Sequence, residues 1–353
     1  MSISMTFKSL EYAIYRNRIF RYYILFRVNG IRSLYLRQHY LSLSSDELRK
    51  VDKKQRKAWI KNSMGYEDFY MLHLEDKSLD QISKYLPYRE CFFFYLDVNS
   101  PRARRTLTNK YEAYNLFSKY YGRRVELISS KELKGDKGLE KLKTFVCEKN
   151  GQYIVKPIGL SQGKGIKILS SLSEIVDYMK TLSGGEIIEE LIVQDESMAV
   201  FNPTSVNTLR IHTANYGNGE VDVLWPCLRM GRAGSVVDNA GAGGIFAAID
   251  AKTGKTISAI DESRNVWTIH PDSKIDLIGV TIPRWGEAVA LAKELAKTLP
   301  DAGFVGWDLA LTKEGWVMVE GNTCPLLIYQ IAVGRGLRPE FHEIKKKFRS
   351  HKV

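Results

Sequence analysis

The feature that most constrains this chain of 353 residues is a β-hairpin pattern near its C-terminus. Residues 306–312 and 316–322 each alternate in the manner of a strand, with a period of two residues. Between them, Lys313-Glu314-Gly315 supplies a three-residue turn with glycine at the position that needs a left-handed backbone. The pattern predicts a hairpin in which Thr312 pairs with Trp316.

This register has a chemical consequence. It places Asp308 opposite Glu320, and the alternation puts Asn322 on the same face. Two facing carboxylates repel each other, and a divalent cation relieves that repulsion. Oxygen ligands of this kind suit Mg²⁺ or Mn²⁺. The spacing alone leaves two interpretations open, which are a metal site and a solvent-facing hairpin edge.

A second pattern is a glycine-rich loop between two short strand patterns. Residues 153–155 predict a strand that leads into Lys156, and residues 166–169 predict the returning strand. The loop carries Lys164 and three glycines, which allow backbone N–H groups to approach an anion. It is not a Walker loop, because no Lys-Ser/Thr pair closes it and a strand follows. The pattern indicates a phosphate loop or, alternatively, a plain turn.

The order of predicted elements favours an α+β fold with mixed or antiparallel sheets, because strands and helices alternate irregularly. The apolar run 91–96 predicts a short buried strand. Helices are expected over 111–121 and 287–298. Further helix starts are indicated by two capping boxes and a proline, namely Ser44 with Glu47, Ser171 with Glu174, and Pro339.

Composition excludes several classes of protein. Hydrophobic residues make up 44% and charged residues 26%, as in ordinary globular proteins. No apolar run approaches the roughly 18 residues of a membrane-spanning helix. The four cysteines form no Cys-x-x-Cys motif and suggest no disulfide framework, so a reducing cytoplasm is expected.

The positive charge is concentrated at the N-terminus. Residues 1–60 hold a net +9 of the total +12, interleaved with aromatic residues in a loosely helical pattern. Three interpretations remain open: a packed helix pair with a solvated basic face, a surface that contacts the membrane or an acidic glycan, and, least favoured, a nucleic-acid surface.

Taken together, the motifs resemble the ATP-grasp superfamily and, more closely, its sugar-transfer-associated family from polysaccharide gene clusters. The similarity covers roughly residues 105–335. The residues that carry it are Lys156-Pro157, Gly163-Lys164-Gly165, 189–194, 202–210, 228–231, 237–240, Gly243-Gly244, 270–272, 282–285, 306–310 and 320–322.

The resemblance implies an ATP-grasp fold, in which two α/β lobes with antiparallel or mixed sheets grip ATP, preceded by a basic and mostly helical region. The implied divisions are the basic region at 1–85, an N-terminal lobe at 86–145, a central lobe with the phosphate loop at 146–196, and a C-terminal lobe with the metal site at 197–353.

The resemblance also implies how ATP is bound. Lys156 matches the lysine that contacts phosphate and adenine, and Lys110 is the expected second nucleotide lysine, although it follows Asn109 where many relatives have aspartate. Glu196 has the spacing of the ribose-binding acid, with Asp195 as its competitor. The remaining residues expected at the nucleotide are Gly163, Lys164, Gly165, Glu189, Glu190 and Ile192.

The metal and reaction residues follow from the same resemblance. The expected ligands of Mg²⁺ or Mn²⁺ are Asp308, Glu320 and Asn322, the trio that the hairpin register gives independently. The residues expected at the transferred phosphate and the acceptor are Arg210, Arg229, Arg232 and Asn239. A structural role is expected for His212, and His270 is expected to be structural or to lie at the rim of the acceptor site. Cys324 is expected to be packed and non-nucleophilic, with a place in the lining of the site as the alternative.

The implied activity is an ATP- and Mg²⁺-dependent carboxylate–amine ligase that works through an acyl phosphate in cell-surface polysaccharide synthesis. One substrate is expected to be sugar-derived, and the location is expected to be cytoplasmic or peripheral on the inner face of the membrane. Two alternatives stay open. They are a phosphotransferase acting on a sugar hydroxyl and a nucleotide-binding scaffold without ligase activity.

Overall fold

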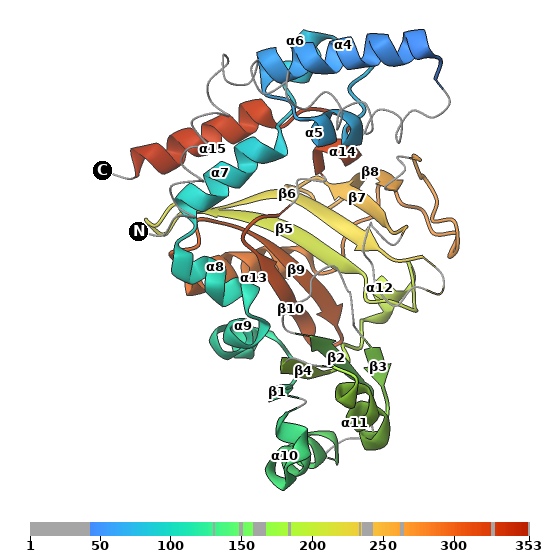
Figure 1. Cartoon of the computed structure of the whole chain (residues 1–353), viewed down its shortest axis with the longest axis vertical. Coiled ribbons are helices and arrows are strands. Elements are labelled where there is room, and N and C mark those ends of the chain that lie inside the picture. Colours follow the sequence, from blue (N-terminus) through green and yellow to red (C-terminus); the bar gives the residue numbers. More distant parts are fainter. Residues whose placement is uncertain are drawn as a thin grey trace. The chain divides into compact units, whose positions relative to one another are not determined.

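The computed structural model divides the chain into two compact units, one made of Met1–Asp97 with Leu326–Val353 and the other of Val98–Pro325 (Figure 1). The residues that it describes are 43–129, 131–147, 151–157, 167–182, 185–232, 234, 243–261, 265–325 and 329–351. None of the helices in these ranges is long and apolar enough to span a bilayer. The division of the chain into four parts stays a prediction.

The first unit is helical where it is described. Its helices are α4 (Ser45–Asn62), α5 (Tyr66–Met71), α6 (Leu79–Ser83), α7 (Tyr88–Val98, which ends one residue inside the second unit), α14 (Tyr329–Ala332) and α15 (Arg338–Ser350). The predicted capping box of Ser44 and Glu47 opens α4. Pro339 lies in the first turn of α15, as expected. A partly buried ion pair between Glu90 and Arg338, with a shortest distance of 2.7 Å, joins α7 to α15.

The predicted strand at 91–96 was wrong, because this segment lies within helix α7. Six consecutive apolar residues fit either period, so the run does not distinguish a strand from a buried helix. In the helix, Cys91, Phe94 and Tyr95 are buried at helical spacing. Phe94 meets Phe341 and Phe348 of α15 edge to face, with ring centroids 4.8 and 5.4 Å apart. This tertiary packing favours the helix.

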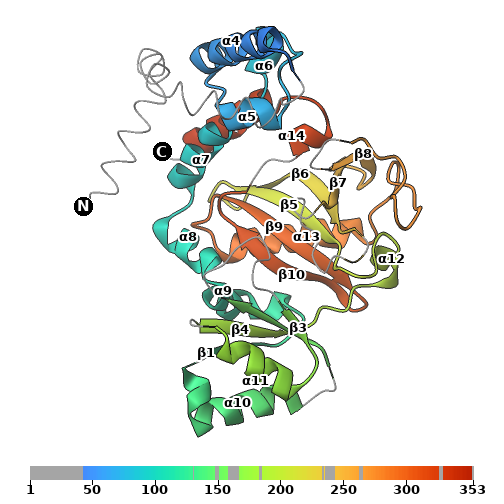
Figure 2. The same cartoon turned by 45° about the vertical axis from the view of Figure 1, so that its right-hand side comes forward.

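The second unit contains a four-stranded antiparallel sheet in the order β1-β4-β2-β3. Helices α10 and α11 pack on one face of this sheet, which is the face turned away from the larger sheet (Figures 1 and 2). The elements are α8 (Pro101–Thr108), α9 (Lys110–Phe117), β1 (Val125–Ser129), α10 (Asp136–Cys147), β2 (Tyr153–Pro157), β3 (Lys167–Leu169), α11 (Leu172–Lys180) and β4 (Gly185–Glu190), with 3₁₀ turns at Ser118–Tyr120 and Glu132–Lys134.

The larger sheet has six antiparallel strands in the order β10-β9-β5-β6-β7-β8. Its elements are α12 (Glu196–Ala199), β5 (Thr208–Asn215), β6 (Val221–Met230), β7 (Ile245–Ile249), β8 (Thr256–Asp261), α13 (Trp285–Thr298), β9 (Phe304–Thr312) and β10 (Gly315–Asn322). Both sheets are antiparallel and lie among helices, so the predicted α+β class is confirmed.

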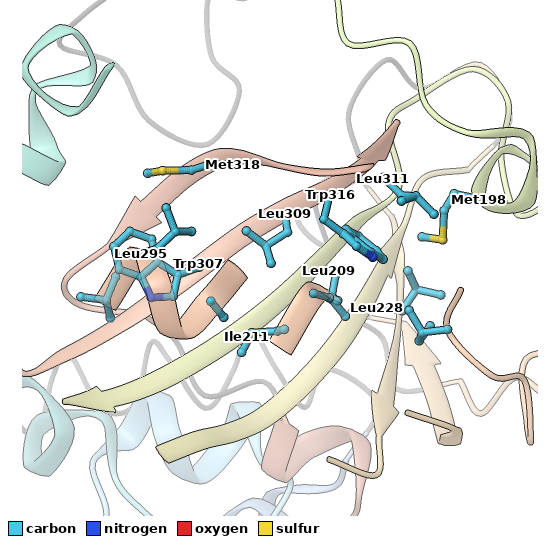
Figure 3. Close-up of a cluster of buried hydrophobic side chains, with 14 of the residues drawn as sticks. Met198, Leu209, Ile211, Leu228, Leu295, Trp307, Leu309, Leu311, Trp316 and Met318 are labelled. Carbon is cyan, nitrogen blue, oxygen red and sulfur yellow. The ribbon is translucent and has the colours of Figure 1, made fainter. Parts of the chain in front are cut away.

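One face of the six-stranded sheet is hydrophobic and packs against α13 (Figure 3). Along β9, Trp307, Leu309 and Leu311 all belong to this core. Because side chains alternate along a strand, Asp308 must point to the opposite face. By the same alternation, Leu209 of β5 faces the core and its neighbour Arg210 points to the opposite face. The core therefore fixes which polar side chains share the other face.

The hairpin joins β9 to β10, but not by the predicted turn. Gly315 pairs with Thr312, so the turn has two residues instead of three. The register then shifts at a β-bulge between Met318 and Glu320, and beyond it Glu320 pairs with Asp308. The predicted pairing of Asp308 with Glu320 is confirmed. It results from a two-residue turn followed by a bulge, whereas a three-residue turn without a bulge was expected.

Candidate active site

The centre of the site is Asp308, which is 2% exposed and lies between two arginines. Arg210 is its direct cross-strand partner on β5 and donates to it through Nε and, at 2.8 Å, through Nη2. Arg229 on β6 donates through Nη1 at 2.9 Å. Burial favours a raised pKa of Asp308, but the two guanidinium groups outweigh it and hold the pKa at about 2. Asp308 is therefore ionised at neutral pH.

Glu320 and Asn322 complete the acidic group. The Asn322 Nδ2 donates to Glu320 Oε1 at 3.1 Å. The Glu320 side chain reaches solvent, yet the surrounding protein partly desolvates its carboxylate, which raises its pKa. The negative charge of Asp308 raises that pKa further. In the described part of the chain no three His, Cys, Asp or Glu side chains form a metal-binding group.

A second buried cluster surrounds Glu189 on β4. Lys156 Nζ on β2 lies 3.0 Å from Glu189 Oε1. Arg123, two residues before the start of β1, lies 2.8 Å from Glu189 Oε2 through Nη2 and donates to it through Nε at 2.9 Å. Burial works to raise the pKa of Glu189, but the two cations overcome it and lower the pKa to about 2. The carboxylate is thus shared between two cations.

Lys110 begins helix α9 and lies near both clusters. Asn109 caps this helix, because its Oδ1 accepts the backbone N–H groups of Tyr111 and Glu112. Asparagine and aspartate are equally good helix caps, so Asn109 can take the place of the aspartate found in many relatives. Burial lowers the pKa of Lys110, Glu320 counters that effect and Lys156 adds to it. These couplings place Lys110 within electrostatic reach of the acidic hairpin and of the lysine strand.

Of the residues expected at the nucleotide, Glu189 and Glu190 end β4, and Ile192 lies in the segment after it. The carboxylate of Glu190 is held by Arg124, whose Nε donates at 3.0 Å. Among the described residues, none forms a hydrogen bond with the backbone of Ile192. Asp195 caps α12 by accepting from Ser197 N at 2.9 Å. Glu196 is exposed in the first turn of that helix.

Other predicted residues lie apart from the Asp308 cluster. Arg232 pairs with Asp272 at 2.6 Å and lies 5.8 Å from the Trp267 ring centroid. His270 is buried, with Nε2 3.2 Å from the Gly231 carbonyl oxygen.

His212 is also buried, and burial lowers its pKa to about 3, which keeps it neutral. Its Nδ1 lies 3.2 Å from the Trp225 carbonyl oxygen, and its ring packs near Trp225 and Phe304. These contacts agree with the structural role expected for this histidine. The predicted residues Gly163, Lys164, Gly165 and Asn239 lie outside the described residues.

Sequence reasoning did not identify Arg123. A signal was present, because Arg123-Arg124 directly precedes a strand and Glu189-Glu190 ends the neighbouring strand of the same sheet. Two adjacent arginines and two adjacent glutamates at the ends of paired strands favour two ion pairs.

The lysine-bearing four-stranded lobe and the six-stranded sheet with its acidic pair together have the ATP-grasp architecture. The chain belongs to the sugar-transfer associated ATP-grasp family, whose sequence model matches residues 93–346. The family expected from the motifs is therefore confirmed. A comparison with curated proteins finds no match.

The solved structures that this chain is similar to include several ligases, all at low identity. D-alanyl-alanine synthetase A from Vibrio cholerae O1 biovar eltor is 11% identical over 69% of this chain and 66% of that one, with a TM-score of 0.44. VanG D-Ala:D-Ser ligase from Enterococcus faecalis is 15% identical over 70% and 62%, with a TM-score of 0.43. The ATP-grasp ligase PsnB, complexed with minimal precursor, Mg and ADP, is 14% identical over 71% and 62%, with a TM-score of 0.41. The chain thus spans about 62% of the PsnB length.

Proposed function

We propose that this protein is an ATP- and Mg²⁺-dependent carboxylate–amine ligase. A substrate carboxylate oxygen attacks the γ-phosphorus of ATP, the bond to the β–γ bridging oxygen breaks, and ADP leaves. An amine nitrogen then attacks the acyl phosphate, loses a proton and expels phosphate, which forms an amide. The observation that carries the proposal is the opposed pair Asp308 and Glu320, with Arg210 and Arg229 on the same sheet face.

The donor set fits a divalent cation. Asp308 and Glu320 oppose each other, desolvation and then the charge of Asp308 raise the Glu320 pKa, and Asn322 adds an amide oxygen. Mg²⁺ held there would offset charge on the phosphoryl group that is transferred. Arg210 and Arg229 lie where they can bind the same phosphoryl oxygens or the incoming carboxylate. For Arg232 and Asn239 we propose roles nearer the acceptor.

The nucleotide side of the proposal depends on the Glu189 cluster. Lys156 and Lys110 supply positive charge for the phosphates, and Glu189 holds Lys156 in place. The backbone of Ile192 is available to an adenine ring, because no described residue forms a hydrogen bond with it. The loop residues Gly163, Lys164 and Gly165 remain proposed phosphate contacts.

The competing ribose acids can be separated by their structural roles. Asp195→Ala removes a helix N-cap and is expected to lower the unfolding free energy, with little effect on ADP affinity. Glu196→Ala removes an exposed carboxylate and is expected to leave stability unchanged while weakening ADP binding about tenfold. Urea unfolding and calorimetric ADP titration measure the two effects. If the two phenotypes were exchanged, Asp195 would be the ribose acid.

The reaction class is tested by ADP release against paired carboxylates and amines, with the product mass recorded. Release that requires both substrates and yields an amide supports the ligase. Release that requires a hydroxyl acceptor alone, with a stable phosphorylated product, identifies a phosphotransferase instead. Nucleotide binding without turnover would point to the scaffold alternative. The family description suggests sugar-derived acids or amines as the first compounds to screen.

The basic N-terminal region is proposed to contact anionic lipid or glycan from the cytoplasm, where ATP is available. Helix α4, within its described part, carries seven Lys or Arg against three acidic residues. Removal of residues 1–42 is the appropriate truncation, because Ala58 and Trp59 of α4 are buried. Sedimentation with anionic vesicles should fall in this truncated form and at high salt. Equal sedimentation of both forms would contradict a role for residues 1–42.

A further inference from the structure

We propose that Arg123 is a positioning residue that ties the nucleotide side of the site to its metal-binding strand. The inference rests on the proposed function and adds to it a residue that couples the nucleotide and metal subsites. Its evidence is a set of contacts that one guanidinium group makes with two different sheets.

The Arg123 side chain is 4% exposed and forms bonds in two directions. Toward the four-stranded sheet, Nε and Nη2 lie 2.9 and 2.8 Å from Glu189 Oε2. Toward the six-stranded sheet, Nη1 donates to the Met318 carbonyl oxygen at 2.8 Å. The same Nη1 donates to the Tyr121 carbonyl oxygen at 3.1 Å. A planar guanidinium can serve these separate acceptors at once, whereas a single ammonium group cannot match that geometry.

Met318 is the last paired residue before the β-bulge of β10. Trp316 and Met318 face the hydrophobic core. Without the bulge, alternation would turn Glu320 toward that core as well. The bulge reverses the parity, so that Glu320 joins Asp308 on the polar face. By binding the Met318 carbonyl, Arg123 holds the strand at the point where this reversal begins.

The approach of the Arg123 segment to β10 is built into its backbone. Gly122 has a φ of +58°, and a Cβ at this position would lie 2.5 Å from Cγ1 of Val317. Only glycine lets the chain come this close. The Tyr121 ring then lies 4.6 Å from the guanidinium carbon of Arg123. These neighbours restrict where the guanidinium can lie.

Through Glu189, Arg123 also affects Lys156. Glu189 offers Oε1 to Lys156 and Oε2 to Arg123. If Arg123 were lost, Lys156 would be the remaining cation of this cluster and would hold the carboxylate more strongly. Less of its charge would then be available to a phosphate. Arg123 therefore acts on the nucleotide through Glu189 and on the metal through Met318 and Glu320.

The test measures the ADP dissociation constant by calorimetry with and without Mg²⁺, in the full chain and in Arg123→Lys and Arg123→Met. The ratio of the two constants reports how strongly metal and nucleotide assist each other. Arg123→Lys keeps a cation on Glu189, so ADP binding without Mg²⁺ should stay within about threefold, while the ratio falls about tenfold. Arg123→Met should weaken ADP binding without Mg²⁺ and should also lower the ratio of the two dissociation constants.

Lys141→Met is the matched control. It removes a cation that binds one carboxylate, Glu126, and one backbone carbonyl, Leu127, in the same lobe, each at 2.8 Å. Its ratio should equal that of the wild type. In a Glu320→Gln background, Arg123→Lys should no longer change the ratio, because its metal effect passes through Glu320.

An unchanged ratio in Arg123→Lys would overturn the inference, even if its melting temperature falls, because a merely structural arginine affects stability alone. A persistent effect in the Glu320→Gln background would overturn it too. If the wild-type chain bound no ADP at all, the proposed function itself would fail and the inference with it. These outcomes are distinguishable, because the last one appears before any variant is made.

Discussion

Asp308→Asn is expected to reduce ADP release about 10²–10³-fold, the largest loss among single substitutions in this site. The substitution keeps the size of the side chain but removes its charge. The proposed metal loses a carboxylate ligand, and Arg210 and Arg229 lose the charge and one of the two accepting oxygens that orient them. Both effects act on the phosphoryl group, so turnover should fall more than ADP affinity. Steady-state ADP release with saturating ATP measures this.

The same substitution should also lower stability, because it leaves two partly buried arginines without their carboxylate. Breaking such a pair costs about 3–5 kcal/mol. Activity must therefore be assayed well below the melting temperature of the variant. Asp301→Asn is the control, since Asp301 also binds one arginine, Arg102, through both oxygens, but at a more exposed position. It should cost at most about 1 kcal/mol and leave ADP release intact. Full activity of folded Asp308→Asn would refute the proposed site.

Because of Glu189, the free energy of unfolding should decrease as the pH falls from 6 to 3. Its pKa is 4.5 without the folded environment and about 2 within it. A lowered pKa stabilises the fold above the unfolded value, and this stabilisation is lost as the pH falls toward the folded value. Between pH 6 and pH 3 the loss amounts to about 2 kcal/mol. Asp308 acts in the same direction, whereas Glu320, with its raised pKa, acts oppositely.

Glu189→Gln isolates this contribution. At pH 7 the variant should be less stable than the wild type, because Lys156 and Arg123 lose their shared carboxylate. The difference in unfolding free energy should shrink by about 2 kcal/mol as the pH falls to 3, since the wild type begins to lose the same charge. Urea unfolding at each pH gives the values. A difference that stays constant with pH would show that Glu189 does not titrate in this way.

Local alternation predicted the acidic pair, because the sequence separation of Asp308 and Glu320 is compatible with facing positions. It could not predict how the pair is reached. A three-residue turn and a two-residue turn followed by a bulge bring the same two residues together, and the choice depends on packing of Trp316 and Met318 against the core. Residues whose geometry depends on one hairpin were therefore the most predictable.

Residues that depend on contacts between distant segments were harder to predict. The role of Arg123 requires knowing that its segment passes close to Val317, almost 200 residues later in the chain. The helix at 91–96 depends in the same way on aromatic contacts with α15. In both cases the local sequence fits more than one structure, and tertiary packing selects between them.

The bulge in β10 also bears on how this hairpin can change during evolution. Adding one residue to the turn while straightening the strand would leave the two acids facing each other. Adding that residue alone would slip the register and turn every later side chain of the strand over. We therefore expect related chains to vary turn length and bulge together as compensating changes, so that an apparent insertion at the hairpin tip preserves the distance between its acidic residues.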